Sequence, residues 1–183
     1  MVILLRPTDV HLRAGRATDA DDLVRVHFAA VHGTASAAYP SHVLDCWAVA
    51  PDDGQRRAAT REAIERGDEL FVVATLNGVV CGFGSIVPAS SELRAVYVDP
   101  DFGGRGVGSA ILRRLEDMAS DNGVSELQMD ASVNAERFYV KHGYRVVRRG
   151  VHHLAGGFEM SCVTMSKGIS RQGSGPPRRQ SAQ

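Results

Sequence analysis

The chain has 183 residues, of which 44% are hydrophobic and 23% are charged, and its 21 acidic side chains balance its 21 basic ones. This length and composition are typical of one globular domain, and the zero formal net charge argues against a nucleic-acid or membrane-surface partner. The three cysteines, Cys46, Cys81 and Cys162, are odd in number and far apart. They fit neither a disulfide framework nor a zinc site, and they indicate a reducing, cytoplasmic environment.

The N-terminal part of the chain predicts an extension, a strand and a long helix. Residues 1–10 are expected to form the extension, because their apolar run is too short for a signal sequence or a membrane span. A strand is predicted at 12–16, and the helix over 18–33 begins with cap-type and acidic residues. His27 and His32 lie on this helix, where we expect packing or surface roles.

Two more helices are predicted before the first hairpin. Ser41 is a suitable N-cap for a short helix whose apolar face carries Val43, Leu44 and Trp47. A charged helix follows over 56–66. Trp47 anchors either a small local core or the wall of a pocket, and the sequence leaves both alternatives open.

An antiparallel meander of three strands is predicted next, over 69–75, 79–87 and 92–98. An Asn-Gly pair between the first two strands is a strong hairpin signal. Gly82 and Gly84, inside the second strand, indicate a bulge or a close approach of another backbone. The meander therefore delivers the chain to the third strand, which leads into the most informative part of the sequence.

This third strand shows an alternating pattern. One face is expected to carry Leu93, Ala95 and Tyr97, with the intervening residues on the other face. Asp99-Pro100 ends the strand, because proline cannot donate to a sheet ladder.

Four glycines occupy the turn that follows: Gly103, Gly104, Gly106 and Gly108. Apolar residues then recur at helical spacing, so a helix begins where the glycines stop. The first amides of a helix have no intrahelical partner, and glycine leaves room for a ligand to reach them. The turn is predicted to hold a pyrophosphate group. The alternative is a flexible loop with a helix cap.

Two common phosphate-binding motifs do not match this turn, since the third dinucleotide glycine and the Lys-Ser/Thr pair of a P-loop are both missing. The stretch instead resembles motif A of the Gcn5-related N-acetyltransferases, [Q/R]-x-x-G-x-[G/A] after a strand ending in V-D-P. Gly106-Val107-Gly108 matches the motif. Gly103 replaces the leading Gln or Arg, and its backbone N–H is expected to remain available.

The C-terminal part predicts a parallel strand and a final hairpin. A strand at 124–129 is expected to pair in parallel with the strand before the glycine turn, through a right-handed crossover. A short helix over 132–142 and strands at 144–152 and 158–167 follow. The composition of 168–183 predicts a disordered tail.

A second motif carries the same resemblance. It is similar to the family's N-x-x-A/x-x-F-Y-x-x-x-G-F/Y signature, with Asn134, Ala135, Phe138, Tyr139, Gly143 and Tyr144. The sequence looks most like the uncharacterised YafP-type branch of the family. The resemblance implies an α+β fold with a single acetyltransferase domain over 11–167. It also implies a mostly antiparallel central sheet of six to seven strands, one splayed parallel pair and about four flanking helices.

The resemblance further implies acetyl-CoA as co-substrate and a small primary amine as acceptor, which attacks the thioester directly in a ternary complex. The pyrophosphate is then expected on the turn, at Gly103, Gly104, Arg105, Gly106, Val107, Gly108 and Ser109. The pantetheine arm is expected against Val96, Tyr97, Val98 and Asn134. Tyr139 is implied as the acid for the leaving thiolate, the alternative being a core tyrosine.

The base and the acceptor pocket are less closely defined. Glu92 is the candidate base, with a water chain, His152 or His153 as alternatives. Trp47 and His152 are expected to line the acceptor pocket. No metal site is expected, because no third ligand is nearby, and a homodimer is compatible with the sequence. The competing function is an acyl-CoA sensor without turnover, which Gly103 keeps open.

Overall fold

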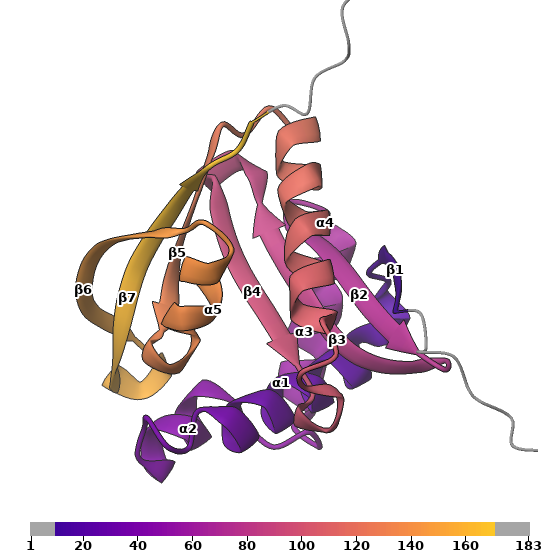
Figure 1. Cartoon of the computed structure of the whole chain (residues 1–183). Coiled ribbons are helices and arrows are strands. Elements are labelled where there is room, and N and C mark those ends of the chain that lie inside the picture. The colour runs from indigo at the N-terminus through magenta and orange to yellow at the C-terminus, as the bar shows by residue number, and fades with distance from the viewer. Residues whose placement is uncertain (1–9, 171–183) are drawn as a thin grey trace, which may run out of the picture.

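A computed structural model of the chain describes residues 10–170 (Figure 1). Most of the predicted extension at 1–10 and of the predicted tail at 168–183 therefore lies outside the described residues. The last strand runs to Gly168, one residue into that tail, and the backbone N–H of Ile169 donates to the carbonyl oxygen of Ser125 at 2.8 Å.

The described residues form one seven-stranded sheet with the order β1-β2-β3-β4-β5-β7-β6. The strands are β1 (His11–Ala14), β2 (Leu70–Leu76), β3 (Val79–Val87), β4 (Glu92–Val98), β5 (Glu126–Ser132), β6 (Arg145–His153) and β7 (Glu159–Gly168). All neighbours are antiparallel except β4 and β5, which pair in parallel at a single position, Glu92 with Gln128. Beyond that pair the two strands diverge (Figure 1), which confirms the predicted splayed parallel pair.

Five α-helices accompany this sheet in the described part of the chain. They are α1 (Ala20–Thr34), α2 (Ser41–Trp47), α3 (Gly54–Arg66), α4 (Val107–Asp121) and α5 (Glu136–Lys141). Helix α4 covers one face of the β2–β4 region, and α1 and α3 cover the opposite face (Figure 1). The architecture is the predicted α+β fold.

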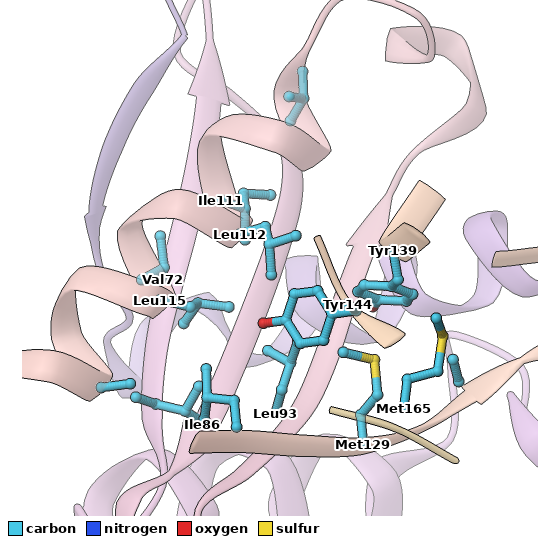
Figure 2. Packing of buried hydrophobic residues seen from close by; sticks show 14 of the residues in the cluster. Val72, Ile86, Leu93, Ile111, Leu112, Leu115, Met129, Tyr139, Tyr144 and Met165 are labelled. Carbon is cyan, nitrogen blue, oxygen red and sulfur yellow. The ribbon is translucent and has the colours of Figure 1, made fainter. Parts of the chain in front are cut away.

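The core under α4 is continuous with the core under α5. Figure 2 shows Ile111 and Leu115 of α4 over the sheet, with Tyr139 and Tyr144 beside them, and all four residues are at most 7% exposed. Helix α4 lies very close to β3 because β3 has no side chain at Gly84. A Cβ atom there would come within 2.7 Å of a Leu115 methyl group. The predicted close approach at the β3 glycines is confirmed.

The predicted alternation along β4 is wrong at one residue. Ser85 of β3 pairs with Ala95 and the next residue, Ile86, pairs with Leu93, so Arg94 is the extra residue of a β-bulge. The bulge moves Leu93 onto the α4 face, away from Ala95 and Tyr97, with which it was expected.

Candidate active site

The divergence of β4 and β5 opens a cleft in the middle of the sheet. A cavity of about 570 Å³ lies between the two strands, and α5 contributes Tyr139 to its wall. A smaller cavity of about 190 Å³ also reaches Tyr139, and it extends past Val98 and Asn134 to Gly108 at the start of α4. The two cavities together connect the glycine turn with the centre of the cleft.

The glycine turn presents a row of free backbone amides. Gly104 and Gly106 have φ values of 70° and 80°, which favour glycine, and Gly106 is the N-cap of α4. None of the N–H groups of residues 104–109 donates to a backbone carbonyl of a described residue. A row of such amides at a helix N-terminus is the arrangement that binds phosphate groups.

Gly103 does not belong to this row. Its N–H already donates to the carbonyl oxygen of Pro100 at 2.9 Å, within a 3₁₀ turn that closes the strand end. The expectation that Gly103 offers a free amide is therefore wrong, because this local turn uses it.

Gly108 and Ser109 connect α4 to α5. Gly108 lies against the ring of Phe138, and a Cβ atom on it would be 3.4 Å from that ring, an ordinary contact distance. The Nδ1 atom of His142 lies 2.8 Å from the Phe138 carbonyl oxygen, and its Nε2 lies 2.9 Å from Ser109 Oγ. A carbonyl can only accept, so in neutral His142 Nδ1 donates and Nε2 accepts from the Ser109 hydroxyl.

The exposed edge of β4 supplies further backbone donors. The N–H of Asp99 donates to Cys81 of β3 at 2.9 Å. Because successive amides of a strand point to opposite edges, the N–H groups of Val98 and Val96 point towards β5. The strand β5 has diverged at this level, so these amides face the cleft instead of a strand partner.

Tyr139 lies where the two cavities meet. It is 7% exposed, and burial raises the pKa of its phenol above the ordinary value of 10. The phenol therefore keeps its proton at neutral pH, as an acid must. Asn134 also lines the smaller cavity; it is exposed, and its Nδ2 is 3.5 Å from the carbonyl oxygen of Thr34.

Glu92 lines the same large cavity as Tyr139, but its carboxylate is already paired. Arg94 donates to its two oxygens at 3.1 and 2.7 Å and also donates to Glu69 at 3.0 Å. The bulge at Arg94 places this guanidinium between the two carboxylates. If Glu92 is the base, its carboxylate must take up a proton while it is paired with Arg94.

Trp47 belongs both to a local core and to the cavity walls. Its indole N–H donates to the Tyr97 hydroxyl at 3.2 Å, its ring packs edge-on against Tyr39, and it borders both cavities. His152 lines the large cavity with its Nδ1 3.8 Å from the carboxylate of Asp130, whereas His153 is paired with Glu159 at 3.7 Å. Trp47 of α2 and His152 of β6 thus both line the large cavity.

The family profile described as "Acetyltransferase (GNAT) domain" matches residues 48–166, more than half of the chain. The chain belongs to the Gcn5-related N-acetyltransferase (GNAT) superfamily. Within GNAT proteins it is similar to the uncharacterised N-acetyltransferase YafP of Escherichia coli (strain K12). The two are 27% identical over 141 residues, which cover 77% of this chain and 85% of YafP.

Solved GNAT structures show the same architecture. A GCN5-related N-acetyltransferase from Rhodopseudomonas palustris matches with a TM-score of 0.78 and 30% identity, over 92% of this chain and 99% of that one. PaiA N-acetyltransferase from Thermoplasma acidophilum, solved in complex with coenzyme A, matches with a TM-score of 0.71 and 19% identity. That match covers 87% of this chain and 99% of PaiA, and it shows the shared fold.

Several polar groups of this GNAT cleft had not been identified from the sequence. The hydroxyl of Thr164 donates to Asp130 at 2.6 Å, and Arg94 and Arg148 line the same cavity. Outside the cleft, His142 was likewise not identified, although it contacts Ser109 of the glycine turn. These residues come from strands or helices that only the fold brings together, and no local motif marks them.

No group of three or more His, Cys, Asp or Glu side chains in the described part of the chain could hold a metal ion. Within residues 10–170, no helix has the length and apolar character needed to cross a membrane.

Proposed function

We propose that this GNAT chain transfers the acetyl group of acetyl-CoA to the primary amine of a small-molecule acceptor, by direct attack in a ternary complex. The observation that carries the proposal is the path from the free amides of residues 104–109, through the smaller cavity, to Tyr139 in the cleft. The three free cysteines fit action in the reducing cytoplasm.

The proposed donor site is built mainly from backbone. The amides of 104–109 would hold the pyrophosphate, with the positive end of α4 adding to the attraction. The pantetheine arm would lie in the smaller cavity, which reaches from Gly108 to Tyr139 and is lined in part by Asn134. Acetyl-CoA supplies an acetyl group activated as a thioester.

The chain's own groups then handle charge and protons. The amides of Val96 and Val98 would stabilise the oxyanion that develops when the amine attacks the carbonyl carbon. As the carbon–nitrogen bond forms and the carbon–sulfur bond breaks, the Tyr139 hydroxyl gives its proton to the leaving sulfur. Glu92, directly or through water, takes the proton that the amine loses, and Tyr139 regains its proton from solvent.

A thiol-release assay tests the proposal. Mixing the protein with acetyl-CoA and a panel of primary amines should release free thiol with at least one of them, and coenzyme A should raise the melting temperature. Stabilisation by coenzyme A without turnover on any amine would favour the acyl-CoA sensor. The occupied amide of Gly103 and the Glu92–Arg94 ion pair are the features that support that second candidate. Stabilisation by NAD or ATP but not by coenzyme A would contradict both.

A further inference from the structure

The large cavity of the cleft has a polar wall on the side of β5, β7 and β6. Thr164 of β7 is paired with Asp130 of β5 and with Arg148 of β6. Since paired residues point to the same face of a sheet, the three side chains form a row, and all three line the cavity. His152 of β6 lines it as well. Tyr139 borders the same cavity, so this polar wall belongs to the space in which the acceptor must lie.

The two acidic side chains that line this cavity already have partners. The carboxylate of Glu92 pairs with Arg94 at 2.7 Å. The hydroxyl of Thr164 donates to one oxygen of Asp130 at 2.6 Å, and Nδ1 of His152 lies 3.8 Å from the other oxygen. Both carboxylates therefore have contacts within the protein before any acceptor enters the cavity.

Arg148 is the charged side chain of this cavity that lacks a partner. It makes no ion pair and no side-chain hydrogen bond with any residue between 10 and 170, whereas the two other arginines of β6 are paired with glutamates. Arg148 is exposed, so a molecule in the cavity can reach its guanidinium. A Cβ atom on Gly150 would lie 3.0 Å from Nη1 of Arg148. The guanidinium therefore lies against this glycine and extends along β6 towards His152.

The charges of the lining favour a carboxylate on the acceptor. Besides His152, two acidic and two basic side chains line the cavity, and three of these four have partners. A guanidinium binds a carboxylate through two parallel hydrogen bonds and keeps its charge throughout the working pH range. A carboxylate would therefore supply the partner that Arg148 lacks. A second ammonium group would instead meet carboxylates that already have contacts.

We propose that the acceptor is a small amine that carries a carboxylate, such as an amino acid, and that Arg148 binds this carboxylate. The inference rests on the acetyl transfer proposed above. The amine of the acceptor lies towards Tyr139 and its carboxylate lies on the polar wall. The apolar part between them packs against Trp47 and Met160, which line the same cavity.

The test compares amino acids with their carboxamides in a thiol-release assay with acetyl-CoA. The panel contains leucine, methionine, phenylalanine and 4-aminobutyrate, each beside its carboxamide, and putrescine as a diamine that Asp130 would attract. We expect kcat/KM for at least one acid to exceed that of its carboxamide and that of putrescine by at least about tenfold. Equal kcat/KM for acids and carboxamides, or a preference for putrescine, would overturn the proposal.

Failure of this inference and failure of the acetyl transfer give different results. Thiol release with other amines but with none of the four acids would overturn the role of Arg148 and leave the acetyl transfer standing. No thiol release with any amine, with stabilisation by coenzyme A, would contradict the acetyl transfer. Calorimetric titration of the four acids into the coenzyme A complex then tests the carboxylate site by itself. Binding that Arg148→Gln removes would support the site, and no binding would overturn it.

Variants of β6 assign the selectivity to one guanidinium. Arg148→Gln should raise KM for the acid at least about tenfold and change KM for its carboxamide much less, a difference that a general loss of structure would not produce. Arg148→Lys keeps the charge without the two parallel hydrogen bonds, so it should recover part of the loss. Arg145→Gln is the matched control, because Arg145 lies on the same strand but is paired with Glu126 and outside the lining. An unchanged KM for the acid in Arg148→Gln, or an equal rise in Arg145→Gln, would overturn the proposal.

Discussion

The Tyr139 phenol is buried, protonated and placed where two cavities meet. Tyr139→Phe should slow thiol release at least about tenfold, the usual effect of removing a general acid. Stabilisation by coenzyme A should remain, because the ring is kept. Burial raises the pKa of this phenol above 10, so deprotonation of Tyr139 should not lower the rate below pH 10.

Tyr144→Phe is the matched control for that variant. The Tyr144 ring packs against the Tyr139 ring with centroids 5.6 Å apart, but it lines neither cavity of the cleft. Removing the Tyr144 hydroxyl should therefore leave the rate of thiol release close to that of the unmodified protein. An equal loss of rate in both variants would show that packing, and not acid catalysis, is the role of Tyr139.

Glu92 can act as the base only if its ion pair with Arg94 leaves an oxygen free for the amine or a water molecule. Glu92→Gln keeps the size of the side chain and removes its basicity, so it should flatten the acidic limb of the pH–rate profile. If the acidic limb persists unchanged, Glu92 is not the base. The pH–rate profile of His152→Gln then shows whether the base is His152 or a water chain.

His27 links stability to pH. Burial lowers the pKa of His27 from 6.5 to about 3, with the nearby charge of Arg56 acting in the same direction. At a pH between about 3 and 6.5, the His27 imidazole is protonated in the unfolded chain but not in the folded chain. The free energy of unfolding should therefore fall as the pH drops below 6.5, by about 1 kcal/mol per pH unit from this residue.

Chemical denaturation at several pH values measures this dependence. His27→Phe removes the titrating group, so its unfolding free energy should change less between pH 6.5 and pH 4. His153→Gln, which replaces a histidine whose side chain is 72% exposed, should keep the dependence of the unmodified protein. An equal slope in His27→Phe would contradict the assignment.

At the scale of elements, the packing of α4 on β3 depends on glycine. A Cβ atom on Gly84 would lie 2.6 Å from the backbone oxygen of Ala95 and 2.7 Å from a methyl carbon of Leu115. The strand oxygen cannot move away without breaking the ladder, so Gly84→Ala should lower the unfolding free energy by roughly 1–3 kcal/mol.

Urea denaturation measures that loss, with Gly54→Ala as the matched control. Gly54 begins α3, and a Cβ atom there would meet nothing within 4 Å. The control should therefore change the unfolding free energy by at most about 0.5 kcal/mol. A neutral Gly84→Ala would mean that both α4 and the β3–β4 ladder can adjust to the added methyl group.

At the scale of the whole molecule, the cleft divides the sheet into β1–β4 and β5–β7, and the segment around α2 connects the two parts (Figure 1). Tyr39, just before α2, accepts a hydrogen bond from the N–H of Val133 at 2.8 Å and donates one to the carbonyl oxygen of Ser161 at 2.7 Å. Both partners belong to the β5–β7 part. This one hydroxyl therefore helps to hold the two parts of the sheet at a fixed separation.

Tyr39→Phe removes both hydrogen bonds and keeps the ring. It should lower the unfolding free energy by roughly 1–3 kcal/mol, since the Val133 amide loses its partner. It should also weaken stabilisation by coenzyme A, because the separation of the two parts becomes less defined. A calorimetric scan with and without coenzyme A measures both effects, and an unchanged scan would show that other contacts set the cleft.

Local patterns were sufficient to predict most elements of this chain. The Asn-Gly hairpin, the proline after β4 and the glycines before α4 each act on the backbone of their own residues. These signals need no distant partner. They also located the turn of free amides, whereas Tyr139 was predicted from the resemblance of residues 134–144 to a family motif.

The tertiary structure decided what depends on neighbours far apart in the sequence. The bulge at Arg94 arises from pairing with β3, and the loss of the Gly103 amide arises from a turn whose geometry the glycine pattern does not reveal. The hydrogen bond from the Trp47 indole to the Tyr97 hydroxyl joins side chains of α2 and β4 that are 50 residues apart in the sequence. Side chains on different elements meet only after the register and helix positions are set, so no single stretch of sequence contains that information.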